Sequence, residues 1–128
     1  MIQQSCLTAL FLLAALPPAL AQAPAPKNEC FFISQFETWK PGGDEKTMYI
    51  RVSGRRFYRL DLANRCSEMS WPGASLVNHF RGSTICSALD WDMKVSQGTG
   101  GFVAPCIVKK MTRLNDNEVA VLPAKQRP

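Results

Sequence analysis

Four arginine side chains lie close together in the sequence, on either side of a single turn signal, Ser53-Gly54. Within nine positions the chain carries Arg51, Arg55, Arg56 and Arg59. If the flanking residues alternate as two strands, Arg51 and Arg59 share the solvent face and the other two lie near the turn. A guanidinium group binds carboxylate or phosphate through two parallel hydrogen bonds. The cluster therefore predicts an anion-binding surface. The alternative is a solvated hairpin whose charges protect strand edges.

The other titratable residues form no recognisable catalytic set. His79 is the only histidine and stands beside apolar residues, and the sequence contains no Gly-x-Ser-x-Gly nucleophile elbow. Asp90 and Asp92 flank Trp91, but a calcium loop needs more oxygen ligands at fixed spacing. We expect no metal, no cofactor and no catalysis. A small enzyme that uses His79 with a nearby carboxylate is the weaker alternative.

The first 21 residues have the composition of a secretory signal peptide. They contain no charged side chain, and residues 6–16 form an apolar run that Pro17-Pro18 and Ala19-Leu20-Ala21 follow. An apolar run before a small-x-small site is the pattern of cleavable signals. A membrane span needs about 20 apolar residues, and the Pro-Pro pair interrupts this run. We expect cleavage near Ala21, a periplasmic or secreted product, and no transmembrane segment in the mature chain.

The cysteines indicate an oxidised protein. Cys6 lies in the expected signal peptide, and the rest of the chain has Cys30, Cys66, Cys86 and Cys106. An even number in an exported chain predicts two disulfides, whereas zinc sites use pairs spaced C-x₂₋₄-C. Three connectivities are possible. We prefer Cys30–Cys106 with Cys66–Cys86, because the first joins the ends of the domain and the second closes a loop worth about 3 kcal/mol.

Composition indicates one small globular domain. The chain has 128 residues, of which 46% are hydrophobic and 20% are charged, with a formal net charge of +5. It is too apolar for a disordered protein and too short for two ordinary domains. We expect a signal peptide at residues 1–21, a Pro/Ala linker at 22–29, a single disulfide-bonded β domain at 30–123 and a tail at 124–128.

Alternation and turn signals predict the strands of this domain. The clearest hairpin joins residues 47–52 to 57–62, with Met48, Ile50, Val52, Tyr58, Leu60 and Leu62 facing inward. Further strands are expected at 30–36, 75–80, 84–89, 93–96 and 106–114. Asn115 and Glu118 have capping-box spacing, which predicts one short helix before Pro123. We expect a mostly β fold: a small antiparallel barrel or curled sheet of five to six strands with one C-terminal helix.

The order of these segments resembles that of a known family. The likeness rests on Cys30-Phe31-Phe32-Ile33, Tyr49-Ile50-Arg51-Val52, Phe57-Tyr58-Arg59-Leu60-Asp61-Leu62 with Cys66 four positions on, Ile85-Cys86 ahead of Leu89-Asp90, Cys106-Ile107-Val108, and Glu118-Val119-Ala120. Over nearly all of residues 30–123 the chain resembles small secreted proteobacterial proteins catalogued as domain of unknown function 6491. The resemblance implies an exported bacterial protein with two cysteine pairs, and it brings no activity, substrate or catalytic residue.

These observations favour a binding protein over an enzyme. We expect a non-catalytic periplasmic binding or accessory module whose arginine hairpin contacts an anionic envelope component or an acidic protein. A structural or stress-related envelope protein that needs only an oxidised, stable fold is the alternative. Tyr49, Phe57 and Tyr58 stand among the arginines, as in proteins that stack single-stranded nucleic acid. Alternation turns Tyr58 inward, however, and an exported protein rarely meets nucleic acid, so we expect no such partner.

Overall fold

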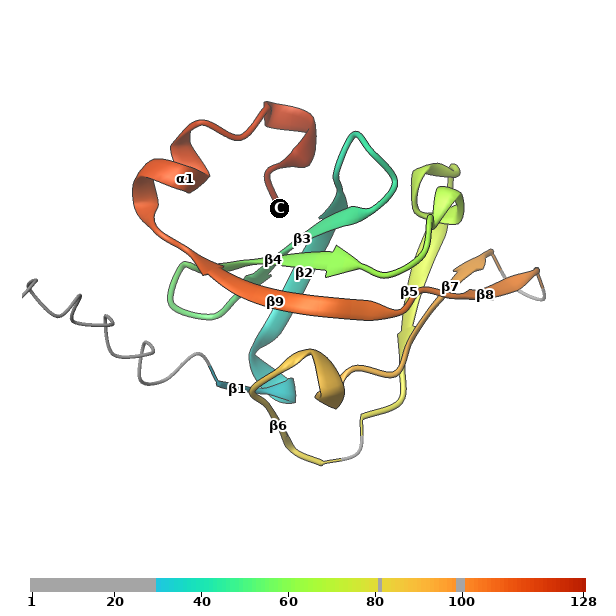
Figure 1. The fold of residues 1–128 in the computed structure, drawn as a ribbon, viewed down its shortest axis with the longest axis horizontal. Coiled ribbons are helices and arrows are strands. Elements are labelled where there is room, and N and C mark those ends of the chain that lie inside the picture. The colour runs from blue at the N-terminus through green and yellow to red at the C-terminus, as the bar shows by residue number, and fades with distance from the viewer. Residues whose placement is uncertain (1–29, 81, 99–100) are drawn as a thin grey trace, which may run out of the picture.

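The computed structural model describes residues 30–80, 82–98 and 101–128. The predicted signal peptide and the linker at 22–29 lie outside the described residues. Within them, nine strands form three antiparallel sheets, and one short α-helix follows the last strand (Figure 1). The mostly β prediction is confirmed. The predicted count of five to six strands was wrong, because the structure has nine, three of them only two or three residues long, and no closed barrel forms among the described residues.

The larger sheet has four strands in the order β2 (Phe36–Pro41), β3 (Thr47–Val52), β4 (Arg56–Leu62) and β9 (Val108–Leu114). The predicted hairpin is β3 paired with β4. Met48 lies opposite Leu60 and Ile50 opposite Tyr58, and these four side chains have no exposed surface. Each fully buried apolar side chain of this size contributes about 1.5–3 kcal/mol to the stability of the fold. The alternation of apolar residues along the sequence therefore predicted correctly which face of the hairpin is buried.

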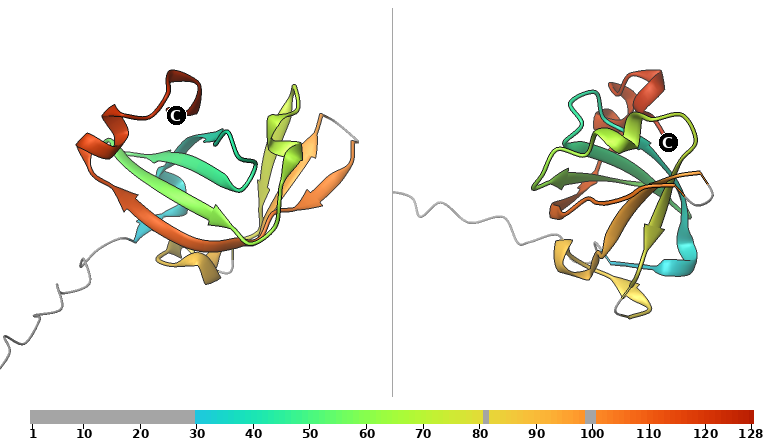
Figure 2. Two further views of the ribbon diagram at one scale, coloured as in Figure 1. Left: turned by 45° about the horizontal axis from the view of Figure 1, so that its top comes forward. Right: turned by 90° about the vertical axis from the view of Figure 1, so that its right-hand side faces the viewer.

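The second sheet has three strands in the order β5 (Ala74–Asn78), β7 (Met93–Gln97) and β8 (Val103–Pro105). Figure 2 shows this sheet at an angle to the larger one, with the chain running from β8 into β9. A third, two-stranded sheet pairs β1 (Phe31–Phe32) with β6 (Thr84–Ile85). Buried residues of all three sheets form one core. In it the ring centroid of Phe31 lies 5.2 Å from that of Tyr58 and 6.3 Å from that of Trp91.

Two predicted strands end early because a side chain caps the backbone. The expected strand at 30–36 stops at Phe32, where a 3-10 helix, Ile33–Gln35, begins and the Gln35 side chain accepts a hydrogen bond from the Phe32 amide at 2.9 Å. The expected strand at 84–89 stops at Ile85. Asp90 accepts hydrogen bonds from the amides of Cys86 and Ser87 at 2.7 and 2.9 Å, and a second 3-10 helix, Ala88–Asp90, follows.

The preferred disulfide pairing was wrong. Cys30 is bonded to Cys86 and Cys66 to Cys106. In the β1–β6 ladder Phe31 lies opposite Ile85, so that Cys30 and Cys86 are the next facing pair, with Cα atoms 4.0 Å apart. Strand pairing, and not the length of the closed loop, decides which cysteines meet.

The second disulfide joins the ends of β4 and β9. The Asn64 side chain accepts from the Ile107 amide at 2.9 Å and donates to the Pro105 carbonyl at 3.1 Å. These two bonds hold the segment before β9 beside the segment after β4, and the Cα atoms of Cys66 and Cys106 lie 5.8 Å apart. The bridges have sequence separations of 56 and 40 residues. In the chain-entropy model each is worth about 4 kcal/mol.

The C-terminal segment folds over the outer face of the larger sheet. The predicted capping box is present, with the Asn115 side chain accepting from the Glu118 amide at 2.9 Å and the Glu118 side chain accepting from the Asn115 amide at 2.7 Å. The helix α1 (Asp116–Ala120) is one turn long, and a 3-10 helix, Ala124–Gln126, follows Pro123. Arg127 donates to the carbonyls of Ala120 and Leu122, which holds residues 124–128 against α1.

Candidate anion-binding hairpin

The β3–β4 hairpin brings the four predicted arginines to one side of the larger sheet and to its turn. In the register Arg51 lies opposite Phe57 and Arg59 opposite Tyr49, on the face away from the core. The prediction that Arg51 and Arg59 share the solvent face is therefore confirmed. Residues 53–55 form the turn and place Arg55 at its tip, where it is exposed.

The turn requires two consecutive residues in the left-handed region. Gly54 has φ of 81° and Arg55 has φ of 59°. Glycine adopts this conformation without steric cost, whereas a side chain with a Cβ pays about 1–2 kcal/mol there. The hairpin thus carries some local strain at Arg55, whose side chain is exposed.

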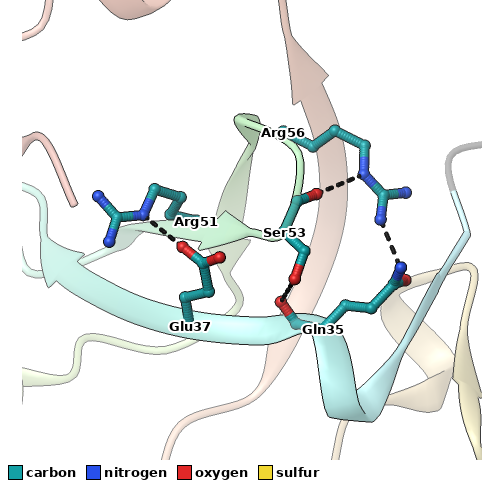
Figure 3. Close-up of polar contacts among 5 residues, drawn as sticks. All are labelled: Gln35, Glu37, Arg51, Ser53 and Arg56. Carbon is teal, nitrogen blue, oxygen red and sulfur yellow. Dashed lines mark hydrogen bonds and ion pairs between the residues drawn. The ribbon is translucent and has the colours of Figure 1, made fainter.

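Arg56 braces the hairpin against the N-terminal part of the domain. Its Nε donates to the Ser53 carbonyl at 3.1 Å, and one terminal nitrogen donates to the Gln35 side chain at 3.0 Å (Figure 3). The other terminal nitrogen donates to the Cys30 carbonyl at 3.3 Å. All three acceptors are neutral, so the positive charge is not compensated. A guanidinium has five N–H groups, and two of these remain for another acceptor.

The two strand arginines are paired with carboxylates. The Nε of Arg51 lies 2.7 Å from a carboxylate oxygen of Glu37, and both side chains are 42% exposed (Figure 3). The Nε of Arg59 lies 3.3 Å from a carboxylate oxygen of Asp61. Such surface pairs contribute about 0–1 kcal/mol. They remove two of the four positive charges, so the positive potential is concentrated at Arg55 and Arg56.

Gln35 and Glu37 belong to this site, and sequence reasoning missed both. Gln35 lies in the segment that was expected to form one continuous strand through residue 36, and Glu37 directly follows it. A bulge between Phe36 and Thr38 in the β2–β3 ladder places Glu37 beside Arg51. The acidic residue next to Phe36 was a visible signal, but the register that brings it to Arg51 depends on the bulge, which has no sequence signature here.

Two aspartates away from the arginines have lowered pKa values, and their carboxylates accept hydrogen bonds that stabilise loops. Hydrogen bonds from the backbone amides of Cys86 and Ser87 lower the pKa of Asp90. A hydrogen bond from the Lys46 amide, helped by the Thr47 hydroxyl, lowers the pKa of Asp44 in the loop between β2 and β3. Asp90, which was weighed as a cation ligand, is thus a capping residue.

His79, the residue of the weaker enzyme alternative, directly follows β5. His79 is exposed, and its backbone amide donates to the Asp92 carbonyl at 3.0 Å. No group of three or more His, Cys, Asp or Glu side chains gathers among the described residues in a way that could hold a metal. Nor does any described helix have the length and apolar character to cross a membrane.

Comparison of the chain with protein-family models, curated proteins and solved structures finds no match. Membership of the family of domain of unknown function 6491 therefore stays a prediction.

Proposed function

We propose that the protein is a non-catalytic binding module of an exported, oxidising compartment, and that the turn of the β3–β4 hairpin contacts an anionic group on an envelope component. The position of Arg56 carries this proposal. Three neutral acceptors hold its guanidinium in place, and Arg55 lies next to it at the exposed tip. Two positive charges therefore share one edge of the molecule without a carboxylate partner among the described residues.

A fixed guanidinium is a better anion receptor than a free one. Immobilising a long side chain on binding costs about 0.5–1.5 kcal/mol, and the fold has already ordered Arg56. The two remaining N–H groups of Arg56 supply charge-assisted hydrogen bonds, and Arg55 adds charge from the tip. The two disulfides support an oxidising location. An anionic lipid headgroup or an acidic protein has the required chemistry.

Vesicle binding tests this proposal. The probe is a vesicle of phosphatidylglycerol mixed with phosphatidylcholine, because anionic lipid surfaces attract basic segments. We expect the double variant Arg55→Ser/Arg56→Ser to bind at least about fivefold more weakly than the wild type, and binding of the wild type to fall with added salt. Arg65→Ser is the matched single-charge control, because Arg65 follows β4 at the end opposite the turn.

The results separate three cases. Weaker binding by Arg55→Ser as well as by the double variant, with Arg65→Ser unchanged, supports the hairpin site. Equal losses from Arg55→Ser and Arg65→Ser would mean that net charge alone attracts the protein to the vesicle, and the site would be wrong. Wild-type affinity in the double variant would likewise exclude the hairpin as the contact surface.

A structural envelope protein is the second candidate, and the bonds of Arg56 also favour it. Two of them join the hairpin to the N-terminal part of the domain, and the bond to the Cys30 carbonyl braces the hairpin beside a disulfide. This function predicts that Arg55→Ser, which leaves every described contact of the fold intact, restores a deletion strain as well as the wild-type gene does. A binding function at the hairpin predicts that it does not.

A further inference from the structure

The two disulfides differ in their exposure to solvent. Cys66 and Cys106 belong to the core, and they have 0% and 1% of their surface exposed. Cys30 and Cys86 are both exposed, at the edge of the domain where β1 lies beside β6 (Figure 1). A disulfide reacts with a thiolate only when the thiolate reaches one of its sulfur atoms. The Cys30–Cys86 bond is therefore accessible to exchange in the folded protein, whereas the Cys66–Cys106 bond is enclosed.

The chain around the exposed bond has further contacts that hold it in place. Phe31 and Ile85, the residues next to the two cysteines, face each other in the ladder and are 2% and 0% exposed. The Ile33 amide donates a hydrogen bond to the Ser83 carbonyl at 3.0 Å. A buried apolar pair and a backbone hydrogen bond thus hold β1 beside β6 in addition to the disulfide. The covalent bond can therefore open without exposing the core.

The two sulfur atoms of this bond have different charged neighbours. Arg56, whose described acceptors are all neutral, donates to the Cys30 carbonyl at 3.3 Å and places a positive charge beside Cys30. The Asp90 carboxylate accepts from the amides of Cys86 and Ser87 and therefore lies beside Cys86. A positive charge stabilises a nearby thiolate, and a negative charge destabilises it. When the bond opens, Cys30 is the better leaving group.

We propose that Cys30–Cys86 is a thiol–disulfide exchange site, which a dithiol reductant opens while Cys66–Cys106 stays closed. One thiolate of the reductant attacks the Sγ atom of Cys86, a new S–S bond forms, and the electron pair of the broken bond goes to Cys30. The second thiolate of the reductant then attacks the reductant sulfur in this mixed disulfide and releases Cys86 as a thiolate. The dithiol leaves oxidised to a disulfide, and its two protons end on the two protein thiols.

Opening this bond also changes the support of the arginine turn. The Cys30 carbonyl is one of the two acceptors that tie Arg56 to the N-terminal part of the domain, and the other is the Gln35 side chain. Without the disulfide the first acceptor is less firmly fixed, and Arg56 loses part of its bracing. The consequence rests on the proposed function: reduction weakens anion binding at the turn, so that the exchange site regulates the binding site.

Differential alkylation tests the exchange site. The exported protein is treated with dithiothreitol under native conditions and quenched with iodoacetamide at intervals, and mass spectrometry of the digest measures the alkylated fraction of each cysteine. We expect Cys30 and Cys86 to react at least about tenfold faster than Cys66 and Cys106, because only the second pair requires opening of the core. Tryptophan fluorescence should stay native after the first pair has reacted. In concentrated urea the two pairs should react at similar rates, which controls for intrinsic reactivity.

The direction of attack has a separate readout. Glutathione has a single thiol, so its mixed disulfide with the protein contains no second thiol to resolve it. We expect glutathione on Cys86 and the alkyl group on Cys30 in the wild type. Arg56→Gln should lower this preference by at least about twofold, because the thiolate of Cys30 loses its positive neighbour. Arg55→Gln is the matched control, since it removes the same charge from a side chain without a printed bond to Cys30.

The opposite results overturn the proposal. Equal native rates for all four cysteines, or loss of native fluorescence as Cys30 and Cys86 react, would show that the exposed bond opens only through unfolding. Glutathione found mainly on Cys30, or equal effects of the two glutamine variants, would show that the assigned direction of attack is wrong.

Vesicle binding by the selectively reduced protein separates the exchange site from the proposed function. Weaker binding than that of the oxidised protein supports regulation of the turn, and unchanged binding would contradict the regulatory link. Equal binding by the oxidised wild type and by Arg55→Ser/Arg56→Ser would instead contradict the proposed function, and the alkylation result would still decide the exchange site.

Discussion

Arg55 and Arg56 are neighbours in sequence, but only Arg56 takes part in the internal hydrogen bonding of the described fold. Arg56→Ala removes two hydrogen bonds that join the hairpin to the Cys30 carbonyl and the Gln35 side chain, and a third within the turn, to the Ser53 carbonyl. We expect this variant to lose about 2 kcal/mol of unfolding free energy in urea, because the bonds involve a charged donor and two of them are part-buried. Arg55→Ala keeps the backbone conformation and should change stability by less than about 0.5 kcal/mol. Equal effects of the two substitutions would contradict the bracing role of Arg56.

Asp90 gives a prediction about pH at the same scale. Hydrogen bonds from the Cys86 and Ser87 amides lower its pKa below the ordinary value of 3.8. A carboxyl group with a lowered folded-state pKa stabilises the fold above its unfolded pKa, and this contribution is lost as pH falls through the folded pKa. We expect Asp90→Ala to be less stable than the wild type by about 1 kcal/mol at pH 7, the usual cost of a lost cap.

The difference between wild type and Asp90→Ala should persist down to about pH 4 and shrink below it. Thermal unfolding measured from pH 7 to pH 2.5 checks this, with Asp92→Ala as the control for loss of an exposed carboxylate. A stability difference that stays constant down to pH 2.5 would show that the carboxylate charge is not what caps this turn.

Among the elements, the one-turn helix α1 depends on its cap more than on its length. Helices this short are unstable in isolation, and the reciprocal bonds between Asn115 and Glu118 supply the missing partners of the first turn. Asn115→Ala should cost about 1 kcal/mol locally. The amides of Val119 and Leu122 should then exchange with solvent about fivefold faster, while the β4 amides keep their rates. Asn117→Ala, on the same turn without a capping bond, is the control.

The strands that could be predicted are those whose alternation and turn residues lie within one short stretch of the sequence. Residues 47–62 alternate strictly around Ser53-Gly54, and β3, β4 and their buried face follow from that pattern. The strand expected at 30–36 does not form as such, because the Ile33 amide donates to the Ser83 carbonyl and Gln35 turns back onto Phe32. A hydrogen-bond partner fifty residues away cannot be predicted from the residues around Ile33 alone. β8 was missed because three residues are too few to show a period.

The same limit applies to the candidate site. Alternation was enough to place Arg51 and Arg59 on the solvent face. It said nothing of their neighbours, because Glu37 reaches Arg51 across a bulge and Arg56 reaches the Cys30 carbonyl across 26 positions. Sequence therefore located the basic cluster. Only the structure, including the register of β2, shows that Arg51 and Arg59 are paired with carboxylates, that Arg56 braces the hairpin and that Arg55 is exposed.

For the whole molecule, the disulfide pairing is the sharpest test of the fold. One bond flanks the β1–β6 ladder and the other joins the ends of β4 and β9. Proteolysis of the exported protein without reduction should give linked peptides for Cys30 with Cys86 and for Cys66 with Cys106. A Cys30–Cys106 link would require a different pairing of β1 and would overturn the arrangement of the sheets around the core.

An intact mass of the same exported protein tests whether the signal peptide is cleaved. An intact mass that begins at Gln22, and that gains alkyl groups only after reduction, would establish signal cleavage near Ala21 and two closed disulfides together. Removing the Cys30–Cys86 bond by Cys30→Ser/Cys86→Ser should cost about 2–5 kcal/mol. It should also weaken anion binding at the hairpin, because Arg56 donates to the Cys30 carbonyl and loses a fixed acceptor when the bond is absent. Unchanged vesicle binding by this variant, at a temperature where it is still folded, would show that a braced Arg56 is not needed for the contact.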